Sequence, residues 1–129
     1  MRNVNKALII LDIENEVGCA NSYNAAVNAM GSNQVAIAAG TYSVASTTGV
    51  NSVAMTTGQY GSASALEKDS LAIGWGDTTK VKGVLNSFIA AASTTPEGHL
   101  DIQLRKVDGV SIMPDTWYSL IDGELRKAE

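Results

Sequence analysis

Glycine recurs every nine residues through the middle of this 129-residue chain. The glycines at this spacing are Gly31, Gly40, Gly49 and Gly58. Gly76 lies two further periods on, and Glu67 takes the place between. The fuller unit is eighteen residues, since 33–40, 51–58 and 69–76 superpose at that spacing. A fixed repeat of this length predicts a stack of similar units, each resting on its own copy.

Each unit begins with a stretch in which bulky and small side chains alternate. The bulky positions are Val35, Ile37, Val53, Met55, Leu71 and Ile73. Ala36, Ala54 and Ala72 stand between them, which is the two-residue period of a strand. The second half of the unit, as in 42–49 and 60–66, alternates Ser, Ala and Thr and predicts a second, smaller strand. Two strands per unit predict an all-β parallel β-roll, a solenoid of about four 18-residue coils.

The outer copies are less regular. An earlier, degraded copy begins at Asn15, and after Gly76 the register slips by one residue, so that 86–93 forms the final copy. Three other repeat folds fit less well. A six-residue helix fails because Thr41 and Thr47 follow Val35 at that period. A calcium-binding nonapeptide roll needs an aspartate in each unit, and a helical repeat needs strong helix formers in place of Gly, Thr, Ser and Asn.

The distribution of charge predicts three segments. Residues 17–66 carry no charged side chain, whereas the last 36 residues carry eleven of the 22 charges. We therefore predict a capping coil at 1–14, the roll at 15–93 and a hairpin-rich cap at 94–129. In this cap Asp108-Gly109 and Asp122-Gly123 predict the turns of a small antiparallel meander.

The first segment contains the apolar run Ala7–Leu11, which is followed by an acid. The run is shorter than the core of a signal sequence, so we predict no export signal. Asp12, Glu14 and Glu16 would discourage further stacking at an open edge.

The repeat motifs resemble a known family. Asn33-Gln-Val-Ala-Ile, Asn51-Ser-Val-Ala-Met and Asp69-Ser-Leu-Ala-Ile-Gly are similar to the head repeats of YadA-like trimeric autotransporter adhesins. The resemblance covers roughly 15–93, and the unit here is longer than is usual in that family. It implies a left-handed parallel β-roll, three chains side by side and a role in surface attachment.

The strand faces that carry alanine fit the narrow space between two closely apposed sheets. The bulky residues, on the opposite faces, then lie outside the roll. Burying each of those side chains is worth about 1.5 to 3 kcal/mol, so an exposed ladder favours assembly. We therefore predict a side-by-side homotrimer with Val35, Ile37, Val53, Met55, Leu71 and Ile73 at its interface. The alternative is a monomeric roll with the bulky residues inside.

Four aromatic residues are candidates for binding a host-surface or carbohydrate receptor: Tyr42, Tyr60, Trp117 and Tyr118. Tyr42 and Tyr60 share one repeat position, which also fits simple stacking between coils. Trp117 and Tyr118 are adjacent, so on a strand they point to opposite faces and one of them belongs to the core.

Catalytic chemistry has little support in the sequence. His99 is the only histidine, and Cys19 falls in the bulky ladder as a small hydrophobe, so we predict no enzyme and no catalytic, metal or cofactor site. The net charge is −4, so we predict no basic surface that could neutralise the phosphates of a nucleic acid. No apolar run is long enough for membrane insertion.

The function expected from these patterns is structural and adhesive: a trimeric β-roll module of a surface fibre or appendage. The alternative is a phage tail-fibre or virion-associated structural protein. Either function would place the chain at a cell surface or in a virion rather than in a cytoplasmic pool of enzymes.

Overall fold

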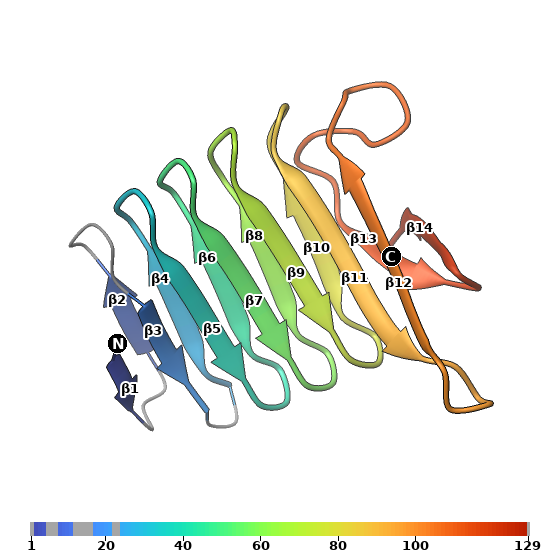
Figure 1. Ribbon diagram of the computed structural model, residues 1–129, viewed down its shortest axis with the longest axis horizontal. Coiled ribbons are helices and arrows are strands. Elements are labelled where there is room, and N and C mark those ends of the chain that lie inside the picture. Colours follow the sequence, from blue (N-terminus) through green and yellow to red (C-terminus); the bar gives the residue numbers. More distant parts are fainter. Residues whose placement is uncertain (1, 5–7, 12–16, 22–23, 129) are drawn as a thin grey trace.

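The computed structural model describes residues 2–4, 8–11, 17–21 and 24–128, and side chains from residue 17 onward within these ranges. Two facing sheets make up this part of the chain, and it has no helix (Figure 1). The first sheet runs in the order β1 (Arg2–Val4), β3 (Val17–Ala20), β5 (Val35–Ala39), β7 (Val53–Thr57), β9 (Leu71–Trp75), β11 (Phe88–Thr94) and β12 (Leu100–Lys106). The second runs in the order β2 (Leu8–Leu11), β4 (Ala26–Ala29), β6 (Val44–Thr47), β8 (Ser62–Ala65), β10 (Lys80–Gly83), β13 (Tyr118–Ile121) and β14 (Glu124–Lys127).

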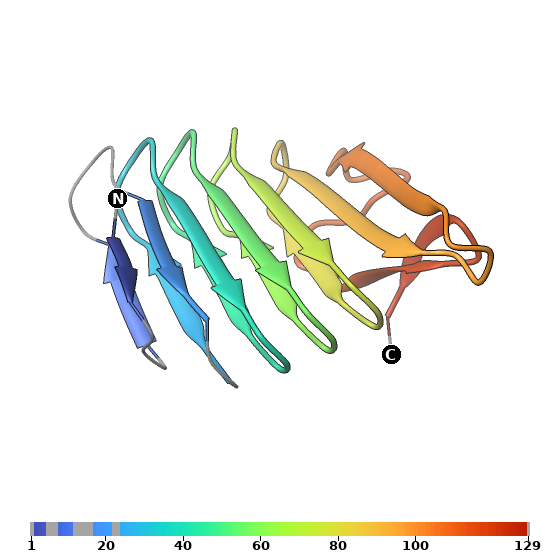
Figure 2. The ribbon, with the colours of Figure 1, turned by 60° about the horizontal axis from the view of Figure 1, so that its bottom comes forward.

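Successive coils stack in parallel at the spacing of the sequence repeat. In the first sheet Val35 pairs with Val53, and Val53 with Leu71, each eighteen residues on. In the second sheet Ala45 pairs with Ala63 at the same spacing. Figure 2 shows the coils side by side from β2 and β3 to β11. The predicted all-β parallel solenoid of about four turns is therefore confirmed.

The coil before β11 is one residue shorter than the others. Phe88 pairs with Leu71, seventeen residues away, while β10 keeps the eighteen-residue offset, with Lys80 opposite Ser62. The predicted slip is confirmed. The missing residue belongs to the turn between Gly83 and Asn86, so no strand has changed the face that it turns inward.

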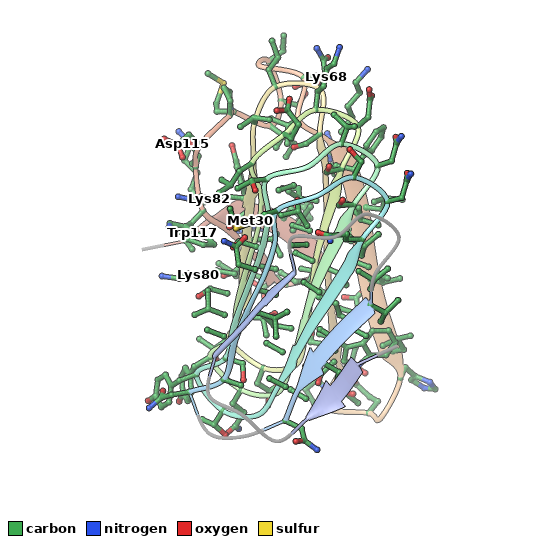
Figure 3. All side chains as sticks on the ribbon, turned by 90° about the vertical axis from the view of Figure 1, so that its left-hand side faces the viewer. Met30, Lys68, Lys80, Lys82, Asp115 and Trp117 are labelled. Atoms are coloured by element: carbon green, nitrogen blue, oxygen red, sulfur yellow. The ribbon has the colours of Figure 1, made fainter. Side chains whose placement is uncertain are left out.

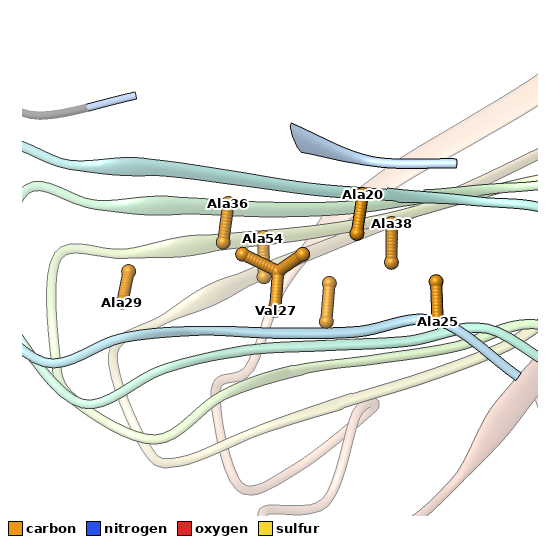
Figure 4. Close-up of a cluster of buried hydrophobic side chains, with 8 residues drawn as sticks. Ala20, Ala25, Val27, Ala29, Ala36, Ala38 and Ala54 are labelled. Carbon is orange, nitrogen blue, oxygen red and sulfur yellow. The ribbon is translucent and has the colours of Figure 1, made fainter. Parts of the chain in front are cut away.

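Small side chains fill the space between the sheets. Alanines of both sheets are completely buried in it; Ala36, Ala54 and Ala72 come from the first sheet, and Ala45 and Ala63 from the second. Figure 4 shows alanine methyl groups and the Val27 side chain projecting into this narrow interior. The predicted bulky ladder lies on the outer side of the first sheet and is half-buried. The alternative prediction, a roll with its bulky residues inside, is therefore wrong.

Two columns of left-handed residues turn the chain at its corners. The first column, with φ between 55° and 70°, contains Asn33, Asn51, Asp69 and Asn86. The second, with φ between 58° and 60°, contains Asn24, Tyr42, Tyr60 and Thr78. Asn and Asp tolerate this conformation better than other residues with a side chain. This tolerance explains why the four units starting at positions 33, 51, 69 and 86 each begin with Asn or Asp.

Thr78 is the β-branched member of the second column, and that conformation strains a β-branched residue. We expect Thr78→Asn to raise the free energy of unfolding by up to about 1 kcal/mol, because asparagine already occupies the equivalent corner at position 24. Urea denaturation would measure the change. Thr94→Asn, at an exposed position without positive φ, is the control and should give no gain. An equal gain in both variants would contradict this explanation.

The carboxyl-terminal part is antiparallel. β12 runs back along β11 over seven pairs, from Phe88 opposite Lys106 to Thr94 opposite Leu100. β13 and β14 form a hairpin through Asp122 and Gly123, both at positive φ, and this hairpin joins the end of the second sheet. The predicted small antiparallel part and its Asp122-Gly123 turn are confirmed.

The hairpin predicted at Asp108-Gly109 is wrong. The Asp108 carboxylate accepts hydrogen bonds from the backbone N–H groups of Val110, Ser111 and Ile112, at 2.8, 2.9 and 3.1 Å. The Gly109 N–H also donates to the Ile112 carbonyl, at 2.9 Å. These bonds close a local turn in place of a second strand, and the chain then crosses from the first sheet to the second.

The same hydrogen bonds, led by that from Val110, hold the pKa of the Asp108 carboxyl below its ordinary value of 3.8. A carboxyl whose pKa is lower in the folded chain stabilises the fold above its unfolded pKa, and loses that contribution as pH falls through the folded pKa. We expect Asp108→Asn to remove this part of the pH dependence of unfolding. Urea denaturation from neutral pH to below 3.8 would show it as a smaller acid loss than in the wild type. Identical acid profiles would contradict the expectation.

The tail shares its core with the last coils. Val107, Ile112 and Tyr118 are buried in one cluster with Val81 and Ile89. At the other end, β1 and β2 pair in parallel with β3 and β4. Asp12, Glu14, Asn15 and Glu16 lie outside the described residues, and the three segment boundaries stay predictions.

Candidate functional site

The outer side of the first sheet carries one continuous surface, which we call the apolar face. Its members are Val17, Cys19, Val35, Ile37, Val53, Met55, Leu71, Ile73, Trp75, Phe88, Leu100, Ile102 and Leu104. All six interface candidates lie here, in two adjacent columns set by the registers Val35–Val53–Leu71 and Ile37–Met55–Ile73. Parallel stacking thus brings residues far apart in the sequence onto one surface.

β12 extends the apolar face beyond the repeats. Ala90 and Ala92 lie directly opposite Leu104 and Ile102 across the antiparallel pair, so all four side chains project from the same side. The alanines are 3% and 1% exposed, whereas Leu104 is 59% exposed. Leu100, Ile102 and Leu104 alternate with polar residues in the sequence, which is typical of a strand. Their place beside the roll could not be predicted, because no local pattern identifies the partner strand.

The apolar face is hollowed where β12 approaches the coils. Val53, Leu71, Phe88 and Leu104 line a shallow apolar depression of about 410 Å³. Trp75, near the other end of its strand, is 42% exposed. Sequence reasoning missed Trp75 and Phe88 because each occupies a repeat position that other coils fill with a smaller residue.

The outer side of the second sheet is polar by contrast. Asn28, Ser46 and Ser64 follow one another in register, and Ser62 lies beside Val44 in the next row. Ser46 Oγ donates a hydrogen bond to Asn28 Oδ1 at 3.1 Å. Lys80 and Lys82 continue the same rows on β10. The two outer sides of the roll therefore suit different surroundings, one apolar and one aqueous.

Tyr42 and Tyr60 stack on each other at a corner beside the polar side, with ring centroids 5.0 Å apart and planes 13° from parallel. The expected stacking between coils is confirmed. Both rings remain about half exposed, at 48% and 47%, so stacking leaves much of each available for contact.

Trp117 and Tyr118 divide as strand geometry predicts. Tyr118 is buried at 3% exposure, and its hydroxyl accepts a hydrogen bond from the Met113 N–H at 2.8 Å. This residue belongs to the core rather than to a binding surface. Trp117 stays partly exposed, and its ring lies 4.8 and 4.7 Å from the Nζ atoms of Lys80 and Lys82. Figure 3 shows Trp117, Lys80 and Lys82 along one side of the roll.

A groove separates the second sheet from the terminal hairpin. β13 pairs with β10 at only one position, Val81 opposite Tyr118, so the hairpin diverges from the sheet. The resulting hollow of about 790 Å³ has Tyr42 and Tyr60 in its lining together with Leu120 and Ile121 of the hairpin. We call it the tyrosine groove. The hairpin is linked to the coils by a 2.9 Å hydrogen bond from Ser119 Oγ to the carbonyl of Thr79, which lies 40 residues earlier in the chain.

The remaining candidates do not come together. His99 lies exposed in the turn after β11, where its N–H donates to Thr95 Oγ1 at 3.1 Å, and Cys19 is half-buried on the apolar face. Among the described residues no three His, Cys, Asp or Glu side chains gather in a way that could hold a metal ion. In the same part of the chain, no helix has the length and apolar character needed to span a membrane.

The fold and its surfaces define a parallel β-solenoid with one apolar and one polar outer side. Comparison of the chain with protein-family models, with curated proteins and with solved structures gives no match.

Proposed function

We propose that this chain is a structural and adhesive module of a surface fibre or appendage, in which three copies pack side by side through their apolar faces. The observation that carries the proposal is the exposure of bulky apolar side chains across strands β3 to β12 of one sheet. A contiguous apolar surface of this kind on a soluble protein marks an interaction site.

The roll gives a physical reason for a partner. Its interior is built largely from alanine, and the bulky side chains of the repeat lie outside, where they can still be buried. Burying them against other copies would contribute about 1.5 to 3 kcal/mol for each side chain that becomes fully covered. The polar side, with its serines and lysines, would remain in water.

The apolar face supports assembly, whereas the number three rests on the resemblance of the repeats to YadA-like heads. Around a three-fold axis each chain would turn its first sheet inward, and the coils would form a rigid shaft. Such a shaft suits a fibre, because it presents the same polar surface in three directions.

The mass in solution tests the proposal. Light scattering on the purified chain should give three times 13.5 kDa over a wide range of protein concentration. A folded monomer at high concentration would overturn the assembly, and a stable dimer would retain the covered face while refuting the trimer.

A further inference from the structure

We propose that the tyrosine groove binds an acidic oligosaccharide, a sugar chain whose negative charge is carried by carboxylates or sulfates. This inference rests on the adhesive part of the proposed function and gives it a ligand class. The lining of the groove, its lysines and its position away from the apolar face support this ligand class.

The groove has the size of a ligand site. Its volume of about 790 Å³ lies within the range of roughly 300 to 1,000 Å³ that small-molecule sites span. One wall is the corner with the stacked tyrosines, and the other is the terminal hairpin with Leu120 and Ile121.

Two lysines give the groove its charge. Lys80 and Lys127 belong to the lining, which contains no acidic residue. Neither lysine has a carboxylate within salt-bridge distance among the described residues, whereas neighbouring Lys82 pairs with Asp115 at 3.4 Å. The Trp117 ring beside Lys80 Nζ holds that ammonium group in place without neutralising it. The described part of the chain therefore leaves two positive charges in the groove without a paired carboxylate, and these can attract an anion.

The remaining lining favours a sugar over a peptide. Aromatic rings pack against the apolar faces of sugar rings, and here two tyrosines and the hairpin side chains supply apolar contact. Ser62, Thr78 and Ser119 add hydroxyls that can exchange hydrogen bonds with sugar hydroxyls. An extended peptide would instead bind along an unpaired strand edge. The lining strands β6 and β8 offer none, because each is paired along both sides.

The groove and the apolar face do not compete. The groove opens over the second sheet, and the apolar face belongs to the first, so copies that meet through their apolar faces leave the groove open. Each groove also lies within one chain. Binding therefore does not need assembly, and the two proposals can fail separately.

The test is a calorimetric titration of the full chain with three hexasaccharides: an oligogalacturonate, a sulfated oligosaccharide and neutral maltohexaose. At least one acidic hexasaccharide should bind, at least tenfold more tightly than maltohexaose, and its affinity should fall as salt is added. Comparison of the two acidic probes distinguishes carboxylate from sulfate recognition.

Three variants locate the site. Lys80→Gln and Lys127→Gln should each weaken binding of the acidic probe by about tenfold, the loss expected for one charge-assisted hydrogen bond. Lys68→Gln makes the same charge change outside the lining and should leave the affinity unaltered; Figure 3 shows Lys68 away from Lys80. Circular dichroism should show the same fold in all three.

Tyr60 tests the aromatic contact. Tyr60→Asn keeps the left-handed corner, because asparagine has that conformation at position 24 of the same column, and it should lower the affinity severalfold. Tyr60→Phe keeps the ring and should bind nearly as the wild type does.

Four outcomes would overturn the inference: no binding of either acidic probe, equal binding of maltohexaose, an equal loss in Lys68→Gln, or equally tight binding of oligoglutamate, which would show that the groove responds to charge alone. Light scattering on the same samples separates this inference from the proposed function. A trimer without sugar binding refutes the inference alone, and a monomer that binds the acidic probe refutes the trimer alone.

Discussion

Replacing Gly49 by alanine is expected to lower the free energy of unfolding by about 3 kcal/mol or more, or to prevent folding. A Cβ atom at this position would lie 2.1 Å from the Gly31 carbonyl oxygen and 2.5 Å from its carbonyl carbon. Both atoms belong to the backbone of the previous coil, so no side chain can move aside. The two coils would have to separate locally, and the ladder hydrogen bonds on either side would stretch.

Gly31→Ala is the matched control, because Gly31 occupies the same column one coil earlier. Among the described residues, the atoms nearest to its new Cβ belong to the Gln34 side chain, the closest at 3.2 Å. We expect a loss below about 1 kcal/mol, since a flexible side chain can shift. Urea denaturation of both variants measures the difference, and equal losses would show that the contact between coils is not the cause.

Val53→Asp is expected to have the largest effect on assembly. In the proposed trimer it would place three carboxylates in the covered interface, and an unpaired buried charge costs about 3 to 5 kcal/mol. The light-scattering mass should therefore fall to that of one chain, or the chain should aggregate through its remaining apolar face.

Val44→Asp makes the same substitution on the polar outer side, where Val44 is 45% exposed. We expect this variant to keep the mass of the wild type. If both variants keep the wild-type mass, the apolar face does not hold the copies together. If both lose it, the effect of Val53→Asp is not specific to that face.

The repeat made the roll predictable. The alternation of Val35, Ala36 and Ile37, repeated eighteen residues on, fixed which residues lie in strands and which side chains point inward. Asn33, Asn51 and Asp69 marked the starts of the units, and the structure supplies the reason in their left-handed conformation. A repeat can be recognised in the sequence because each coil packs against nearly the same neighbours and so needs nearly the same residues.

The tail was less predictable because its contacts are not local. Asp108-Gly109 has the residues of a hairpin turn, but a hairpin also needs a second strand, and the Asp108 carboxylate instead closes the chain on itself. Ser119 donates a hydrogen bond to the Thr79 carbonyl, 40 residues away in the sequence, and no local pattern predicts a contact over that separation. This contact helps to place the hairpin that forms one wall of the tyrosine groove. The sequence could therefore predict Tyr42 and Tyr60 as candidates, but not the hairpin residues that line the groove with them.

The shortened turn between Gly83 and Asn86 shows where this chain tolerates a change in length. A residue removed within a strand would turn the following alanines outward and the bulky side chains into a space that has no room for them. A residue removed at this corner left Ile89 buried in the interior and Phe88 outside. An insertion at the equivalent corner between β8 and β9, where Lys68 is exposed, should likewise be accommodated, so this corner suits a grafted loop or an attached label. The corner at Gly49 is unsuitable because of its close backbone contact with Gly31.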